Sequence, residues 1–228
     1  MSERFQRTEM LIGEEGVKRL NSCHVAVFGI GGVGGYVVEA LARCGVGELT
    51  LVDRDVVSES NLNRQIIALE STIGRSKTEV MKERIAQICP DTKVHAYETF
   101  FLPENSHEFP FETYDYVVDA VDTVTAKIEI IMKCQSMNVP VNSTMVTGNK
   151  LDPSKLEVAD IYKTTMCPLA KVMRKELKNR GVKHCKVVYS TEPPVANHRT
   201  PGSISFVPAS AGLLLASAVV RDLLGKDV

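Results

Sequence analysis

The segment GIGGVG, residues 29–34, has the residue types and spacing of a phosphate-binding loop. It matches the pattern G-x-G-x-x-G and lies between an apolar run, residues 24–30, and a stretch whose apolar residues have helical spacing. Glycines let the backbone turn tightly and approach phosphates, while a helix N-terminus supplies N–H donors and a positive dipole. In this context the glycines predict nucleotide binding rather than helix packing alone.

Asp53 follows the next apolar run, residues 48–52, and is the expected partner of the ribose. A carboxylate at the end of this strand can accept hydrogen bonds from ribose hydroxyls. The loop and Asp53 leave the nucleotide open, because a dinucleotide and ATP both offer ribose and phosphates.

Two cations after Asp53 favour ATP. Arg64, in SNLNRQ, and Lys77, at the start of an expected helix, both lie at the carboxyl edge of the expected sheet, where open α/β sheets bind ligands. Either one alone could form a surface ion pair. Together they fit a triphosphate, because phosphates in transfer need cationic clamps and the two phosphates of a nicotinamide cofactor are largely held by the glycine loop.

Two carboxylates end a further apolar run at the same edge. Asp119 is the more embedded in the strand, so Asp122 is the predicted Mg²⁺ ligand.

These residues are positioned by strands and helices that alternate. We expect strands over 24–30, 48–52, 93–97, 115–121 and 139–144, and helices over 33–44, 77–88 and 125–137. Such alternation predicts an α/β fold, a Rossmann-like, doubly wound, mostly parallel sheet. After residue 148 the pattern loosens into strands over 154–160, 185–190 and 203–207, helices over 168–179 and 209–224, and a Pro-rich loop over 191–202. We expect one domain, residues 1–228, with a core over 22–147 and a C-terminal elaboration over 148–228 that could include an antiparallel edge.

The overall composition limits the classes of protein to which this chain can belong. The chain has 228 residues, is 44% hydrophobic and carries a formal net charge of -1, so nothing overall demands nucleic acid or an anionic membrane. The N-terminus has no secretory pattern, and the apolar run 211–220 is shorter than the roughly 20 residues of a membrane span. These features predict a soluble, cytoplasmic protein without a membrane span.

The six cysteines form no C-x-x-C pair and the histidines are equally dispersed, which argues against a structural zinc site. We expect reduced thiols, with Cys44, Cys89 and Cys134 packed on helices. Cys167, just before an expected helix, is interpreted as non-catalytic because no basic activator is evident beside it.

The expected helix 168–179 and its exit carry a local excess of cations around the single Glu176. They are Lys163, Lys171, Arg174, Lys175, Lys178, Arg180, Lys183 and Lys186. Such a cluster can neutralise nucleic-acid phosphates, although a soluble helix is often merely rich in lysine. The candidate contacts are Lys171, Arg174, Lys175 and Lys178.

Five separated motifs, GIGGVGG, LVDRD, SNLNRQ, GRSK and DAVDT, resemble the ubiquitin-activating-enzyme-like adenylating enzymes in order and approximate spacing. The resemblance implies that ATP is the nucleotide and that Asp122 binds Mg²⁺. It implies further roles for the phosphate-lining Gly29, Gly31, Gly32 and Gly34, the ribose-binding Asp53, the orienting Asn61, Arg64 and Gln65, and the phosphate-contacting Lys77. Arg7, in RFQR, would act on the partner's ATP, which requires a homodimer.

Longer stretches, such as RFQRTEMLIGEEGVKRL and VVYSTEPP, look like the branch that dehydrates threonylcarbamoyladenosine in tRNA. The resemblance implies that the threonine carboxylate is adenylated by ATP and that the carbamoyl group then closes a ring, without an enzyme nucleophile. A sulfur-relay protein is a further partner left open. The main alternative is adenylation of the C-terminal glycine of a small sulfur-carrier protein, although such activators typically have two C-x-x-C pairs. Two further hypotheses are a nicotinamide-dependent oxidoreductase and a catalytically silent scaffold that binds nucleotide for stability.

Overall fold

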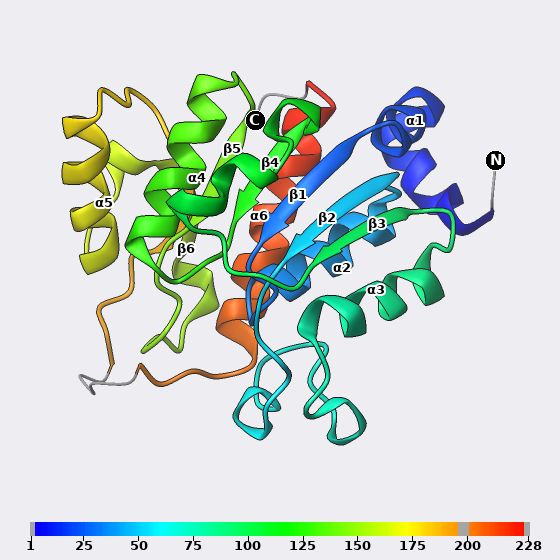
Figure 1. Ribbon diagram of the computed structural model, residues 1–228, viewed down its shortest axis with the longest axis horizontal. Helices are drawn as coiled ribbons and strands as arrows, with labels where there is room; N and C mark the ends of the chain where they lie inside the picture. Colours follow the sequence, from blue (N-terminus) through cyan, green and yellow to red (C-terminus); the bar gives the residue numbers. More distant parts are fainter. Residues whose placement is uncertain (1–2, 196–200, 226–228) are drawn as a thin grey trace.

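Seven short strands form one sheet in the order β3-β2-β1-β4-β5-β7-β6 (Figure 1). The computed structural model describes residues 3–195 and 201–225. The strands are β1 (His24–Phe28), β2 (Glu48–Val52), β3 (Lys93–Tyr97), β4 (Tyr116–Asp119), β5 (Val141–Thr144), β6 (Leu156–Asp160) and β7 (Lys186–Ser190). All neighbouring pairs are parallel except β6 and β7, so the α/β prediction and its antiparallel edge are confirmed.

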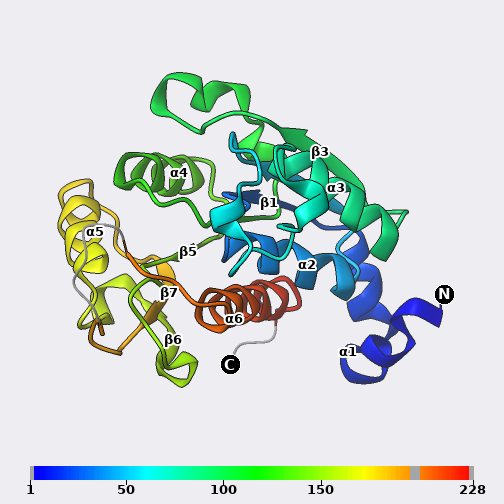
Figure 2. The same ribbon diagram turned by 90° about the horizontal axis from the view of Figure 1, so that it is seen from below.

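Helices cover both faces of the sheet (Figure 2). They are α1 (Gln6–Asn21), α2 (Gly34–Cys44), α3 (Lys77–Ile88), α4 (Val124–Ser136), α5 (Pro168–Asn179) and α6 (Phe206–Leu223). Side chains of α2, α3 and α6 share one buried cluster with β1 and β2, whereas α4 and α5 pack in clusters on the other face. The inner strands β1, β2, β4, β5 and β7 are therefore mostly buried, as their apolar sequences require, whereas the edge strands β3 and β6 are partly exposed.

The chain runs outward from β1 to β2 and β3, then returns to β4 on the other side of β1 and continues to β5. The order therefore reverses between β1 and β4. Ligands of open α/β sheets bind at such a reversal, beyond the carboxyl ends of the strands.

Glycines make the turn after β1 possible. Gly29 has a φ of 90°, and a Cβ there would lie 2.6 Å from the carbonyl oxygen of Ala120. A Cβ on Gly34 would lie 1.8 Å from the carbonyl oxygen of Gly29. Side chains at these two positions would push the loop away from β4 and from the start of α2, so the loop that faces the reversal point needs glycine.

The predicted strand over 203–207 is wrong. Helix α6 already begins at Phe206, earlier than the predicted residue 209. Val207, Ala211, Leu215 and Val219, spaced by four residues, are fully buried on one face of α6. Pro208 lies in the first turn, where a missing N–H removes no helical hydrogen bond. The alternating apolar residues Ile204 and Phe206, which suggested a strand, lie just before and at the start of this helix.

Helix α6 is long and apolar enough to cross a membrane by length and composition alone, and half of it is buried inside the protein. Its buried face packs on α2 and on β5, β6 and β7. A core helix of a globular protein has the same properties, so α6 is no clear membrane span.

The C-terminal elaboration extends the same sheet, because β7 pairs with β5. Of the predicted Pro-rich loop 191–202, residues 196–200 lie outside the described residues.

Candidate functional site

A cavity of about 410 Å³ opens at the carboxyl ends of β1, β2 and β4. The glycine loop, the segment 60–65, the start of α3 and the loop after β4 line it, together with residues from the C-terminal elaboration. The lining includes Gly29, Gly31, Gly32, Asp53, Asn61, Arg64, Gln65, Lys77 and Asp122. Of the nucleotide-site residues expected from the sequence, Gly34 and Arg7 are the ones that do not line it.

Asp53 ties the glycine loop to the end of β2. Its Oδ2 accepts a hydrogen bond from the Ile30 N–H at 2.7 Å, and its Oδ1 accepts one from the Asp55 N–H at 2.8 Å. A carboxylate has about four lone-pair sites, so two remain for hydroxyl donors. Asp53 can therefore hold the loop and bind a ribose at the same time.

Lys77 reaches this carboxylate pair from the first residue of α3. The residue is only 5% exposed, and its Nζ lies 2.8 Å from Asp55 Oδ2 and 4.0 Å from Asp53 Oδ1. Lysine is almost never this buried unless it is paired. The two carboxylates therefore hold a cation inside the cavity, where it can face a phosphate.

The segment 60–65 starts in a short 3-10 helix, Glu59–Asn61, and continues as a turn beside the glycine loop. The side chain of Asn61 accepts the Ser58 N–H at 3.1 Å. Gln65 is buried, and its Oε1 has no hydrogen-bond partner among the described residues. Buried polar atoms are normally paired, so this amide oxygen is an exception, in a residue that lines the cavity.

Arg64 lies on the glycine loop. Its Cγ is 3.4 Å from the place that a Cβ on Gly32 would occupy, so the absent side chain makes room for the arginine stem. Its Nη1 donates to the carbonyl oxygen of Ser60 and to Asn63 Oδ1, both at 2.8 Å. These contacts place a guanidinium at the cavity edge.

The two carboxylates after β4 differ sharply. Asp119 is fully buried, and its Oδ2 accepts hydrogen bonds from Lys127 Nζ at 3.0 Å and Ser143 Oγ at 2.5 Å. Asp122 is exposed and lines the cavity, and among the described residues its carboxylate has no hydrogen-bond or ion-pair partner. Asp122 is therefore available to bind a ligand, whereas the carboxylate of Asp119 is occupied by hydrogen bonds that stabilise the fold.

Lys127 was missed from the sequence. Its ammonium is buried, and it also donates to the carbonyl oxygen of Thr144 at 2.7 Å. Because Asp119 Oδ1 accepts the Val121 N–H at 3.2 Å, the pair fixes the loop that carries Asp122. Its helical spacing could have indicated its burial, because Lys127 lies on the same buried face of α4 as Ile130, Ile131 and Cys134.

The C-terminal elaboration closes one side of the cavity, which no sequence motif indicates. Gly148, Pro201, Gly202, Ser203 and Pro208 line it, next to Thr147 at the end of the core. Asn63 Nδ2 donates to the carbonyl oxygen of Ser203 at 3.0 Å, and the Gly202 N–H donates to Asn149 Oδ1 at 2.7 Å. Contacts across more than 50 residues therefore complete the site.

Arg7 lies away from the cavity of its own chain. Its neighbour Phe5 packs against Gly45, at the C-terminal end of α2, whereas the cavity is at the N-terminal end. An 11-residue helix is about 16 Å long. Figure 1 shows α1 beside the amino ends of the strands, opposite the cavity edge.

The cations predicted on and near α5 differ in their contacts. Lys171, Lys175 and Lys178 are exposed. Arg174 instead donates to the carbonyl oxygen of Thr164 at 2.9 Å and to its hydroxyl. Arg180 pairs with Glu176 and Lys186 with Asp222, so these cations are partly neutralised.

All six cysteines are free. Cys134 is buried in α4, Cys89 directly follows α3, and Cys167 caps α5, its Sγ accepting the Ala170 N–H at 3.5 Å. Burial raises the pKa of the Cys44 and Cys134 thiols and raises the pKa of Cys185 to about 12. A protonated thiol is a poor nucleophile, so these three cysteines do not suit covalent catalysis.

Comparisons with known proteins agree with this geometry. The ThiF family model matches residues 5–228. The tRNA threonylcarbamoyladenosine dehydratase of Bacillus subtilis (strain 168) is 41% identical over 247 residues, which covers 100% of this chain and 97% of that protein. Crystal structures of the E. coli tRNA N6-threonylcarbamoyladenosine dehydratase in complex with AMP and with ATP align with TM-scores of 0.93 and 0.92. Each is 36% identical, and the alignment covers 98% of this chain and 95% of theirs.

A more distant relative covers less of the chain. The probable adenylyltransferase/sulfurtransferase MoeZ of Mycobacterium tuberculosis (strain ATCC 25618 / H37Rv) is 38% identical over 116 residues. These are 51% of this chain and 29% of that protein.

Proposed function

This chain belongs to the ThiF family and, within it, to the tRNA threonylcarbamoyladenosine dehydratases, and we propose that it carries out the ATP-dependent dehydration of N6-threonylcarbamoyladenosine in tRNA. The full-length identity to the dehydratase of Bacillus subtilis carries this proposal. The cavity supports it, because a glycine loop, two cations and a free carboxylate are what an adenylating site needs.

In the first step, an oxygen of the threonine carboxylate attacks the α-phosphorus of ATP. The bond between the α- and β-phosphates breaks, and pyrophosphate leaves with the electron pair. Charge grows on the phosphate oxygens, and Lys77 and Arg64 at the cavity wall stabilise it. Gly31 and Gly32 let the backbone approach the phosphates, while Asp53 accepts the ribose hydroxyls and Asn61 and Gln65 orient the nucleotide.

In the second step, the carbamoyl group attacks the acyl carbon of the adenylate. The acyl–oxygen bond breaks, AMP leaves, and the carbamoyl group loses a proton, so the tRNA has lost one water overall. Both reacting groups belong to one nucleoside, and their high effective concentration favours ring closure. No enzyme nucleophile is required, in keeping with the buried, protonated thiols.

Mg²⁺ fits the chemistry of the donor set. Asp122 offers hard carboxylate oxygens, whereas Asp53 and Asp55 already bind N–H groups and Lys77. When bound, Mg²⁺ would neutralise charge on the phosphates, and Asp122 would hold it.

Adenylation of a small sulfur-carrier protein is the less favoured alternative. The sulfurtransferase relative shares only about half of this chain, whereas the dehydratase relative aligns end to end. A sulfur-relay partner stays a prediction. A cytoplasmic location fits a tRNA substrate and a core helix α6.

Mass spectrometry of nucleosides tests the activity. Substrate tRNA carrying threonylcarbamoyladenosine is incubated with the protein, ATP and Mg²⁺, then digested. We expect the modified nucleoside to lose the mass of one water only when ATP is present. Unchanged nucleoside, together with pyrophosphate exchange that depends on a carrier protein, would support the alternative instead.

We also propose that the protein is a homodimer in which Arg7 completes the partner's site. Arg7 is exposed and lies about one helix length from its own cavity, so it can reach a nucleotide only in another copy.

Mixed dimers of Arg7→Ala and Lys77→Ala test this arrangement. Each variant alone should be inactive, but a reassembled 1:1 mixture should regain about a quarter of wild-type turnover, because half of the dimers are mixed and each holds one intact site. If Arg7 acts within its own chain, no mixed site is intact and the mixture stays inactive.

The exposed lysines of α5 are the proposed tRNA contacts. Replacing Lys171, Lys175 and Lys178 together by glutamine should lower tRNA affinity and reduce the slope of log K against log salt by about two to three, since each removes one phosphate contact. Lys82→Gln/Lys93→Gln, two exposed lysines on α3 and β3, is the control. An equal slope in all three proteins would exclude α5 from the interface.

A further inference from the structure

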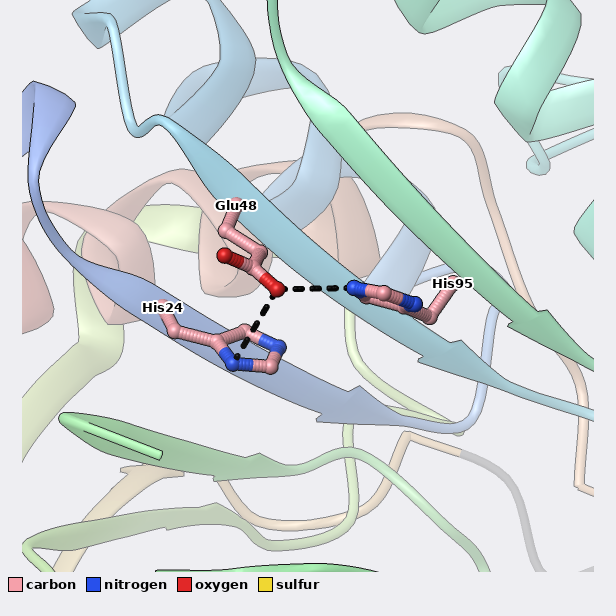
Figure 3. A group of neighbouring side chains, drawn as sticks. All are labelled: His24, Glu48 and His95. Atoms are coloured by element: carbon pink, nitrogen blue, oxygen red, sulfur yellow. Dashed lines mark hydrogen bonds and ion pairs between the residues drawn. The ribbon is translucent and has the colours of Figure 1, made fainter. Parts of the chain in front are cut away.

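At the edge of the sheet opposite the nucleotide cavity, His24, Glu48 and His95 converge on one face. Figure 3 shows the three side chains, which come from β1, β2 and β3, pointing toward one another. His24 and Glu48 are register partners at the first positions of β1 and β2. His95 lies two residues beyond the partner of Glu48 on β3, so the parallel register brings all three together.

The three side chains have the donors of a metal centre. One ligand atom from each lies within 4.8 Å of the others. Glu48 Oε1 lies 2.7 Å from His95 Nε2 and 3.7 Å from His24 Nδ1. Bonds of about 2.0–2.1 Å to a tetrahedral ion separate its ligands by about 3.4 Å, so small side-chain rotations suffice to enclose one.

The surrounding residues orient the metal-binding atoms of these side chains and leave them accessible through a cavity. His24 Nε2 lies 2.8 Å from Thr50 Oγ1. In the tautomer in which Nε2–H donates to Thr50, the lone pair of Nδ1 is left for a metal, as in many His sites. A cavity of about 400 Å³, lined also by Thr113 and Asp115, leads to the three side chains.

We propose that His24, Glu48 and His95 bind a divalent transition metal, zinc by the type and number of their donors. Two imidazoles and one carboxylate form a set that Zn²⁺ takes with a solvent molecule as fourth ligand. The site ties together β1, β2 and β3. It is separate from the nucleotide cavity: none of the three residues lines that cavity, and His24 and Glu48 are the first residues of their strands, whereas the cavity lies beyond the carboxyl ends.

Co²⁺ is the probe, because its visible absorption reports tetrahedral imidazole ligation. Full-length protein, stripped with a chelator, is titrated with Co²⁺ in excess Mg²⁺, which keeps the carboxylates of the nucleotide cavity from competing. We expect one Co²⁺ per chain, displaced by Zn²⁺. His95→Gln can still donate a hydrogen bond to Glu48 but has no imidazole, so it should weaken binding by about 100-fold or more, beyond the usual effect of an outer-shell change.

His184→Gln is the matched control, because His184 also faces a carboxylate, Asp160, at 3.5 Å. It should bind Co²⁺ as the wild type does. Circular dichroism and ATP binding confirm that each variant is folded. Glu48→Gln removes a different proposed ligand and should also weaken Co²⁺ binding. Absence of Co²⁺ uptake by the wild type, or equal uptake by His95→Gln and Glu48→Gln, would overturn the proposal and leave the three residues as a hydrogen-bonded group.

Discussion

Replacing Lys77 with methionine is expected to lower the rate of ATP-dependent adenylation by about 10³-fold. The Lys77 ammonium is buried in the cavity wall, 2.8 Å from Asp55 and 4.0 Å from Asp53. In a water-excluded site, one fixed charge aimed at developing negative charge contributes about 10²–10³ to the rate, and here the charge on the phosphates is larger than on a single oxyanion. Methionine has nearly the same length and fills the space without the charge.

The fold should survive this change. Asp55, the closer partner of Lys77, has a side chain that is 58% exposed, so water can solvate its carboxylate when the lysine is absent. Asp53 keeps its two backbone N–H donors. The loss of rate should therefore appear without loss of secondary structure.

Pyrophosphate release with substrate tRNA, together with circular dichroism, measures the effect. The control is Lys82→Met, which removes an exposed lysine of the same helix that lies 3.9 Å from Glu79. It should leave the rate within about twofold of wild type, as expected for an exposed ion pair. A Lys77→Met variant with more than a tenth of wild-type activity would remove Lys77 from the chemistry.

Replacing Arg64 with alanine should also lower the rate of adenylation, by about 10²–10³-fold. Its stem lies on Gly32, and its guanidinium is held at the cavity edge by Ser60 and Asn63. The planar guanidinium can bind two phosphate oxygens at once, whereas lysine is a point charge. Arg64→Lys should therefore recover only part of the rate.

Arg180→Ala is a close control for Arg64→Ala. Both arginines donate from Nη1 to the carbonyl oxygen four residues earlier, Ser60 in one case and Glu176 in the other. Losing that local bond alone should therefore affect the two variants equally in thermal stability. A loss of turnover confined to Arg64→Ala would assign the effect to the nucleotide site, and near-full turnover of Arg64→Ala would reject the role.

Most helices and strands and the nucleotide-binding motifs follow from the amino-acid sequence. The predicted helices over 77–88 and 168–179 have the bounds that the structure shows, because caps, prolines and apolar spacing are local signals. The prediction that Asp53, Arg64, Lys77 and Asp122 share one edge is correct, because parallel strands deliver their carboxyl ends together.

Which polar groups meet depends on the tertiary structure. Lys127 donates a hydrogen bond to Asp119, and Arg174 donates one to Thr164. Packing brings these helix side chains to groups that no local sequence pattern specifies. Ser203 reaches Asn63 across 140 residues to close the cavity. His24, Glu48 and His95, dispersed in the sequence, converge because the register of three parallel strands sets them side by side. Local propensity indicates roughly where most strands lie, but register and packing are properties of the whole sheet.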